Sequence, residues 1–273
     1  MRHALAFLLL LLLLPACESA GLETRPGATS VLDMFNTDPT PAEAAQMAID
    51  RYDADRRYRG TLILANQPFG GEDLYQQLFL DNIKDEDAGV RAAATRALGN
   101  HGKPDQVPLI VDRLADDDVA VRQEAARALQ RLHNPVAIEP LVNALDPEKE
   151  LDTEVRSEAA MALSQYPSPR VLQALIAAMD DPQLAVNRNA QLALRALTGQ
   201  DFALDRKAWA QWASDNPQPF AAQTPFIYPI FFRDRYWYEY LPFIPRPPNE
   251  SASSPAGFTY PTELASTPRP APK

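Results

Sequence analysis

Residues 118–129 read Asp-Val-Ala-Val-Arg-Gln-Glu-Ala-Ala-Arg-Ala-Leu, and closely similar stretches begin at Asp87 and at Asp152. A fourth copy begins at Gln183; it keeps the apolar positions but lacks the aspartate and the arginine. A weaker, earlier copy begins at Asp53. The four clear copies start 31, 34 and 31 residues apart. Self-similarity at such a period is the signature of a solenoid built from stacked helical repeats.

Each copy contains what is needed to begin one helix and to bury one of its faces. Aspartate at the first position is a strong N-cap, because its carboxylate accepts a hydrogen bond from a free backbone N–H. The valine, alanine and leucine positions fall at helical spacing and form one apolar stripe. A helix-length apolar stretch precedes each copy, and these stretches cover 42–52, 74–83, 107–114, 137–145 and 171–179. We therefore predict five helix pairs, which must stack because no pair can bury its stripe alone.

Proline marks where the folded domain ends. Of the 26 prolines in the chain, 13 lie at or after Pro217, and helices are improbable there. Before the repeats, the chain has no apolar periodicity. The predicted organisation is a signal peptide over 1–16, a flexible tether over 17–40, a solenoid over 41–216, an aromatic-rich extended segment over 217–246 and a disordered tail over 247–273.

The repeated pattern D-x-x-V-R-x-x-A-x-x-A-L resembles the HEAT repeat, in the subclass also found in phycobilisome-lyase-like proteins. The resemblance covers about 41–197. It implies an all-α solenoid, a right-handed superhelix of about five helix pairs whose second helices line the concave face. The stretch 197–202, followed by Trp209 and Trp212, resembles the closing segment of many bacterial HEAT-repeat proteins. We expect it to cover the last repeat with one more helix over 205–214.

The N-terminus reads as an export signal. Arg2 and His3 precede an apolar run over 4–14 that is shorter than the about 20 residues a membrane-spanning helix needs. A basic start, a short apolar segment and small residues after it are typical of a cleaved signal. The only cysteine, Cys17, directly follows Leu-Pro-Ala, and this stretch resembles the lipobox of bacterial lipoproteins.

The lipobox resemblance implies that Cys17 becomes the N-terminus of the mature chain and carries acyl groups. Two or more acyl chains anchor a protein stably to a membrane. The following residue is Glu18 and not aspartate, which in that family favours the outer membrane. The alternative is an ordinary secretory signal that ends in Ala-Cys.

The charge balance restricts the class of partner. The chain has 26 basic and 36 acidic residues, a formal net charge of −10. Nucleic-acid binding rewards basic patches, so we expect no nucleic-acid partner. The same balance argues against broad contact with anionic lipid.

The arginines that recur in the repeats have two interpretations. Arg91, Arg122 and Arg156 occupy equivalent positions and could form a ligand-binding stripe. In HEAT-like repeats this position usually forms a structural ladder with aspartates. We favour the structural interpretation and expect the ladder partners to be Asp87, Asp118 and Asp152.

The best candidates for partner binding are second-helix positions that vary between copies and point away from the apolar stripe. The alternative is a face that is merely solvated. The candidate residues are Arg96, Gln123, Glu124, Arg127, Glu158 and Arg188.

The sequence offers little material for catalysis. Deoxyhypusine hydroxylase, a HEAT-like enzyme, holds iron on repeated His-Glu pairs, and this sequence contains no His-Glu pair. It also has no H-E-x-x-H motif, no cysteine pair, no glycine-rich phosphate loop and no G-x-S-x-G elbow. Bilin lyases, the other relatives, act in the cytoplasm, which conflicts with an export signal. We expect neither an enzyme, nor a metal, nor a small-molecule cofactor.

The segment 225–245 is unusually aromatic for a linker, because disordered segments are poor in aromatic residues. It could fold back onto the flank or end of the solenoid. It could instead anchor an envelope partner, since Tyr and Trp are favoured at interface hot spots. Contact with the membrane interface is the third alternative. The candidate anchor residues are Tyr236, Trp237, Tyr238 and Tyr240.

These observations together predict an exported, lipid-anchored scaffold that binds a protein or peptide of the cell envelope on its repeat surface. The alternatives are an envelope enzyme or lyase-like accessory factor with an unrecognised site, and a structural envelope protein without a discrete ligand.

Overall fold

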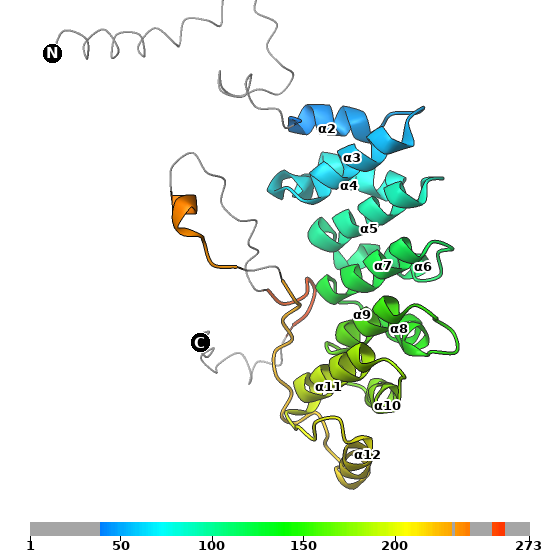
Figure 1. Cartoon of the computed structure of the whole chain (residues 1–273), viewed down its shortest axis with the longest axis vertical. Helices are drawn as coiled ribbons and strands as arrows, with labels where there is room; N and C mark the ends of the chain where they lie inside the picture. The colour runs from blue at the N-terminus through cyan, green and yellow to red at the C-terminus, as the bar shows by residue number, and fades with distance from the viewer. Residues whose placement is uncertain (1–38, 231–232, 241–252, 260–273) are drawn as a thin grey trace, which may run out of the picture.

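The computed structural model of the chain describes residues 39–230, 233–240 and 253–259. Over these residues the fold is all-helical, with eleven α-helices and one isolated β-bridge. The helices form a single stack that runs from α2 at one end to α12 at the other (Figure 1). The predicted signal peptide and nearly all of the predicted tether lie outside the described residues.

Five helix pairs and a closing helix make up the stack, as the sequence predicts. In each pair a first helix is followed by a longer second helix. The pairs are α2 (Pro41–Ala48) with α3 (Ala54–Ala65), α4 (Asp73–Asn82) with α5 (Ala88–His101), α6 (Val107–Arg113) with α7 (Val119–Arg131), α8 (Ile138–Leu145) with α9 (Thr153–Leu163), and α10 (Pro169–Ala178) with α11 (Leu184–Thr198); α12 (Arg206–Asp215) closes the stack.

The aspartate at the first position of each repeat begins the second helix. Asp53, Asp87, Asp118 and Asp152 each accept a hydrogen bond from a backbone N–H in the first turn of α3, α5, α7 and α9. In the divergent last repeat, Gln183 precedes α11 and makes no side-chain cap. The first-position aspartate is therefore a local signal that starts a helix.

The two layers of the stack are packed differently. Each second helix lies directly against the next one, along α3, α5, α7, α9 and α11. Small residues allow this approach: a Cβ added to Gly99 of α5 would lie only 2.7 Å from the Cβ of Ala128 in α7. The first helices are further apart and leave open grooves between α6 and α8 and between α8 and α10. The second helices therefore form the more closely packed layer of the stack.

The closing helix α12 covers the exposed end of the core. Trp209 is fully buried, and its indole Nε1 donates to the carbonyl of Ala203 at 3.0 Å. Phe202 packs edge-on against it, with ring centroids 4.9 Å apart. A solenoid needs such a cap because its last repeat has no neighbour to bury its apolar stripe.

A ladder of ion pairs connects each second helix to the following repeat. Arg57 pairs with Asp85, Arg91 with Asp116, Arg122 with Glu150 and Arg156 with Asp181, with Nε to carboxylate distances of 2.8, 2.9, 2.7 and 2.8 Å. In each case the second nitrogen of the guanidinium reaches the other carboxylate oxygen. Such two-point contacts fix both position and orientation.

The expected ladder partners were wrong. Asp87, Asp118 and Asp152 do not pair with the arginines, because their carboxylates are used as N-caps. The ladder acid stands two residues before the cap of the next repeat. Its second role is to accept the backbone N–H of the cap residue, as Asp116 does from Asp118 at 3.1 Å and Glu150 from Asp152 at 2.8 Å. One acid thus holds the arginine of the preceding repeat and the first residues of the next second helix.

The last repeat closes the ladder without an arginine. Asn187 occupies the equivalent position, and its amide donates to the carbonyls of Ala178, Met179 and Asp181 at 2.9–3.2 Å. The shorter side chain satisfies carbonyls within its own repeat and does not extend to the next one. This difference marks the point where the repeats end.

We predict that Arg156→Met lowers the free energy of unfolding by about 3–5 kcal/mol, because it leaves the carboxylate of Asp181 buried without its cation. The two side chains are 4% and 1% exposed. The measurement is urea unfolding followed by circular dichroism. The double variant Arg156→Met, Asp181→Leu should recover much of the loss.

The matched control is Arg170→Met, which breaks an exposed pair with Glu139 and should cost less than about 1 kcal/mol. Equal losses for the two arginines would contradict a stabilising ladder.

Candidate binding surface

The side chains that vary between repeats lie on the solvent-facing side of α5, α7, α9 and α11. We call this surface the second-helix face. Four of the six predicted candidates, Arg96, Gln123, Arg127 and Glu158, are partly exposed there, and Arg188 is exposed. The structure links most of them to one another across repeats.

Glu124 lies at the centre of these links and not at the surface. Its carboxylate accepts from Arg96 Nε of the preceding repeat at 3.0 Å and from Arg127 of its own helix at 3.3 Å. The residue is only 9% exposed. The hydrogen bond to Glu124 raises the pKa of the Arg96 guanidinium, against the opposing effect of burial. The charge of Glu124 is thus paired with two arginines, and its remaining exposed atoms line the cavity between α5 and α7, so partner contact by this residue stays a prediction.

Arg127 carries the network into the next repeat. Its Nη2 donates to Glu154 at 2.7 Å and its Nε to Glu158 at 3.1 Å. Gln123 likewise reaches forward and donates to Asp152 at 3.1 Å. A row of charged and amide side chains therefore crosses from α5 over α7 to α9, held by contacts between successive repeats.

The row continues onto α11 through amide and hydroxyl groups instead of charged groups. Asn189 donates to the hydroxyl of Ser157 at 2.8 Å and to its carbonyl at 3.2 Å. Arg188, beside it, is exposed. Beside the row, a cavity of about 210 Å³ opens between α5 and α7, with Asn66, Arg96 and Arg127 in its wall. The second-helix face is thus polar, continuous over four repeats and locally hollowed.

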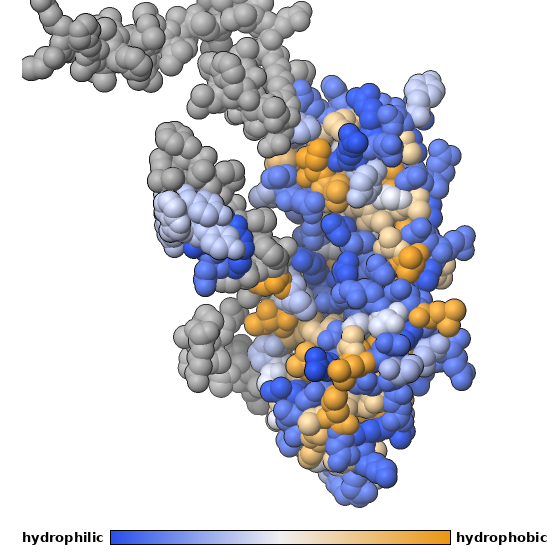
Figure 2. Space-filling view, viewed as in Figure 1, coloured by the Kyte–Doolittle hydropathy of each residue, from blue (hydrophilic) through white to orange (hydrophobic). Residues whose placement is uncertain are grey.

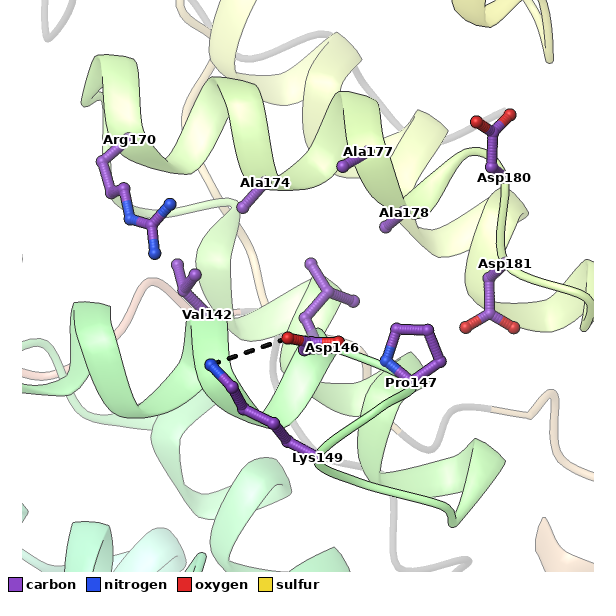
Figure 3. Close-up of a pocket in the computed structure, with 11 residues that line it drawn as sticks. Val142, Asp146, Pro147, Lys149, Arg170, Ala174, Ala177, Ala178, Asp180 and Asp181 are labelled. Atoms are coloured by element: carbon purple, nitrogen blue, oxygen red, sulfur yellow. Dashed lines mark ion pairs between the residues drawn. The ribbon is translucent and has the colours of Figure 1, made fainter.

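The grooves on the opposite side of the stack have both apolar and charged residues in their walls. Figure 3 shows the one between α8 and α10, a cavity of about 340 Å³. Ala174 and Ala177 line one wall, and Lys149 pairs with Asp146 at 3.6 Å in the other. Among the residues that the structure describes, no group of three or more His, Cys, Asp or Glu side chains is placed to hold a metal ion.

The C-terminal ends of the second helices form an edge at which backbone carbonyls must be satisfied. The last turn of any helix leaves carbonyls without intrahelical donors. At the end of α3, the carbonyl of Ala65 is met by the side chains of Asn100 and His101 from the next repeat, both at 2.9 Å. At the end of α7, Gln165 donates to the carbonyl of Leu129 at 2.7 Å. At these two helix ends, side chains of the following repeat thus supply the missing donors.

The C-terminal part of the chain runs back along this edge and completes the capping. Thr224 N donates to the carbonyl of Ala196 in α11 at 2.8 Å. Further along, Ala256 N donates to the carbonyl of Arg131, and His133 N donates to the carbonyl of Ala256, both at 2.8 Å. These two bonds make the parallel bridge between Leu132 and Ala256. Figure 1 shows the segment lying beside the ends of α11 and α7.

Side chains support this docking. Arg131 lies over the ring of Tyr228 at 4.8 Å, and Phe226 is buried. Phe258 packs edge-on against His133 at 4.8 Å, and His133 stacks on Tyr166 at the same distance. Burial lowers the pKa of His133, which favours the neutral ring in this position.

The docked residues revise the prediction for the C-terminus. The sequence allows three alternatives for 225–245: folding back onto the solenoid, anchoring a partner and contacting a membrane. Residues near Phe226 and Tyr228 fold back onto the stack, so the first alternative applies to that part of the segment. The prediction of a disordered tail over 247–273 is corrected for 253–259, which pack on the end of α7. The rest of that tail lies outside the described residues.

The predicted aromatic anchors belong to a turn that we call the aromatic knob, residues 233–240, which includes the 3₁₀ helix η6 (Trp237–Tyr240). Tyr236, Trp237, Tyr238 and Tyr240 are 56%, 81%, 41% and 70% exposed. The knob is closed by Glu239, which accepts from Arg233 Nη1 at 2.7 Å and from the backbone N of Tyr236 at 2.8 Å. The hydrogen bond from Arg233 lowers the pKa of Glu239 to about 2.

Two features of the structure were not predicted from the sequence, namely the ladder acids and the docking of 253–259. The ladder acids had a usable signal, since Asp85, Asp116 and Glu150 each stand two residues before a capping aspartate. The docking of 253–259 had none, because it depends on a single main-chain pairing and on the backbone of Gly257, which has a φ of +84°.

Comparison with known proteins agrees with this architecture. Residues 77–152 match the family model for HEAT repeats, and residues 155–181 match the model for the PBS lyase HEAT-like repeat. Both matches lie within the stack, between α4 and the loop after α10. No curated protein sequence matches it.

Three solved structures illustrate the similarity. YibA of Escherichia coli is 23% identical with a TM-score of 0.47, over 57% of this chain and 59% of that one, so the chain spans less than two thirds of YibA. An engineered protein is 20% identical with a TM-score of 0.47, over 64% and 85% of the two chains. A designed armadillo repeat protein is 18% identical with a TM-score of 0.44, over 65% and 91%.

Over the described ranges, none of the helices combines the length and apolar character needed to span a bilayer.

We predict that Gly257→Ala detaches residues 253–259 from the end of α7. The left-handed backbone costs a residue with a Cβ about 1–2 kcal/mol. The added Cβ would also lie 2.5 Å from Pro104 Cγ and 3.1 Å from the carbonyl of His133. The amide of Ala256 should then exchange with solvent at least about tenfold faster, as a loss of 1.4 kcal/mol implies.

Gly71→Ala serves as the control, because its added Cβ would meet nothing closer than 3.8 Å. Unchanged exchange at Ala256 in the Gly257 variant would show that the docking does not depend on this residue.

Proposed function

We propose that this protein is a non-catalytic scaffold, tethered to the bacterial cell envelope through a lipid on Cys17, whose second-helix face binds a protein or peptide partner. The observation that carries the proposal is the continuous row of polar side chains linked across repeats, from Arg96 on α5 to Asn189 on α11.

A linked row suits recognition because its side chains are already ordered. Immobilising a long side chain on binding costs about 0.5–1.5 kcal/mol. Arg127 has lost that freedom beforehand, since it contacts Glu124, Glu154 and Glu158 at once. The row can therefore present a fixed pattern of charge to a partner. The match to HEAT repeats supports this at the level of the fold, although function is decided by the site.

The extended shape of the partner is supported by the chain's own C-terminal segment. That segment lies along the helix ends and is held by main-chain bonds at Ala196 and Arg131. The fold thus already binds extended chain at its edge through backbone groups, the mode that gives affinity without demanding one sequence.

The tether is supported by the sequence before the described residues. Leu-Pro-Ala-Cys at 14–17 ends a short apolar run, and Glu18 follows. A chain anchored there would hold the solenoid close to the membrane, because a flexible segment of roughly 25 residues reaches about 25–30 Å. The outer membrane is the destination we propose.

Site-specific photo-crosslinking in cells tests the binding surface. We predict that a photoreactive residue at Gln123 or Arg188 captures one partner of defined mass, whereas the same residue at Glu139 does not. Glu139 is exposed like Arg188 but lies on α8, on the opposite side of the stack. The captured species should be the same at Gln123 and Arg188, because both belong to one face.

Capture at Glu139 alone would place the partner on the first helices, and capture at none of the three positions would count against a scaffold. Repeating the experiment on a chain ending before Pro225 separates the helical face from the C-terminal segment.

Metabolic labelling with a radioactive fatty acid tests the tether. We predict that the wild-type chain incorporates label and sediments with the outer membrane, and that Cys17→Ser abolishes the label. The chain has no other cysteine, so the substitution removes the only thiol. A labelled Cys17→Ser chain, or an unlabelled wild-type chain, would refute lipidation at this position.

A further inference from the structure

The aromatic knob has its polar group inside and its rings outside. Glu239 is 6% exposed and is enclosed by Arg233 and the backbone of Tyr236. Trp237 and Tyr240, by contrast, are 81% and 70% exposed. This is the reverse of the usual arrangement in a small turn. Large exposed rings grouped together mark an interaction surface.

Three of the four rings are in contact with one another, and Tyr240 follows them in the same turn. Tyr236 and Tyr238 stack with centroids 5.5 Å apart, and Trp237 meets Tyr238 edge-on at 6.0 Å. The knob stands apart from the helical stack in Figure 1, where it is drawn in orange, and in the matching view of Figure 2. The patch is therefore presented to the surroundings.

Two cations border the patch. The guanidinium of Arg233 lies 4.8 Å from the centroid of Tyr236, and that of Arg235 lies 5.7 Å from the centroid of Tyr240. In sequence, the stretch 225–246 carries three arginines against Asp234 and Glu239, a net charge of +1 in a chain whose net charge is −10. The aromatic patch thus lies in a stretch that lacks the net negative charge of the whole chain.

These features fit the interface of a lipid bilayer. Trp and Tyr gather at the level of lipid headgroups, because each ring has an apolar body and a polar tip. Arginine extends its charged group to the phosphates while its stem stays with the apolar atoms. On both sides of the knob the sequence is apolar, with Ile230 to Phe232 before it and Leu241 to Ile244 after it.

We infer that the aromatic knob is a membrane-contact site, in which Trp237, Tyr236 and Tyr240 enter the interface of an anionic bilayer and Arg235 contacts lipid phosphates. The inference goes beyond the proposed function, since it requires neither acylation of Cys17 nor a protein partner. It gives the scaffold a second contact with the membrane, at the opposite end of the sequence from the tether.

The test measures where Trp237 lies when the full-length chain is bound to vesicles of phosphatidylcholine and phosphatidylglycerol that contain brominated acyl chains. Bromine quenches only indoles that enter the bilayer. The contribution of Trp237 is the difference in emission between the wild type and Trp237→Phe, which leaves Trp209 and Trp212 in α12 unchanged. We expect the emission of Trp237 to shift to shorter wavelength and to be quenched.

Two variants keep the reporter and change its surroundings. Tyr236→Ser with Tyr240→Ser should weaken the quenching of Trp237 and raise the vesicle concentration needed for it by about tenfold or more, because two rings no longer gain from burial. Arg235→Gln should remove the preference for phosphatidylglycerol. Tyr52→Ser is the matched control, since Tyr52 is 98% exposed but lies in the first repeat, far from the knob.

Vesicle-bound chain whose Trp237 is not quenched overturns the inference, and so does quenching that the tyrosine variant leaves unchanged. A chain that does not bind vesicles overturns it as well. If Trp237 responds only to an added envelope protein, the knob binds protein and not lipid. Failure of the scaffold proposal is separate, because it is read from crosslinks at Gln123 and Arg188 on the second-helix face.

Discussion

The ion pair between each second-helix arginine and the acid of the following repeat is the constraint on which the stack depends. It joins repeats at the same place three times in clear copies, at Arg91, Arg122 and Arg156, and once more in the weak first copy. Because the same acid also receives the N–H of the next helix cap, each pair sets both the distance between repeats and the start of the following helix. Buried charges are costly unless paired, so this register is defined sharply.

The proposal for the second-helix face rests on that register. With the second helices held close by Gly99, Ala128 and similar small residues, side chains from neighbouring repeats meet, and Arg96, Glu124 and Arg127 form a network instead of three independent charges. The same alignment brings the C-terminal ends of α7 and α11 to one edge, where the carbonyls of Arg131 and Ala196 accept hydrogen bonds from the returning chain. The second-helix face and its edge are consequences of one spacing.

The aromatic residues near the C-terminus divide into two groups with different surroundings. Phe226 and Tyr228 are held against the stack, whereas the knob carries its rings outward around an internal Arg233–Glu239 pair. Composition alone could not separate them, because both groups have the same residue types in one short stretch. The distinction comes from the positions at which main-chain bonds fasten the segment, at Thr224 before the knob and at Ala256 after it.

The sequence by itself determined the fold class, the five pairs and the closing helix, because capping and apolar periodicity are local and are repeated in each copy. It also indicated that Arg91, Arg122 and Arg156 form a structural ladder. Only the tertiary structure decided their partners, since Asp85, Asp116, Glu150 and Asp181 belong to the next repeat and compete with nearer aspartates that are occupied as caps. Only the structure buried Glu124 and docked 253–259, because both outcomes depend on contacts between residues distant in sequence, which no local pattern encodes.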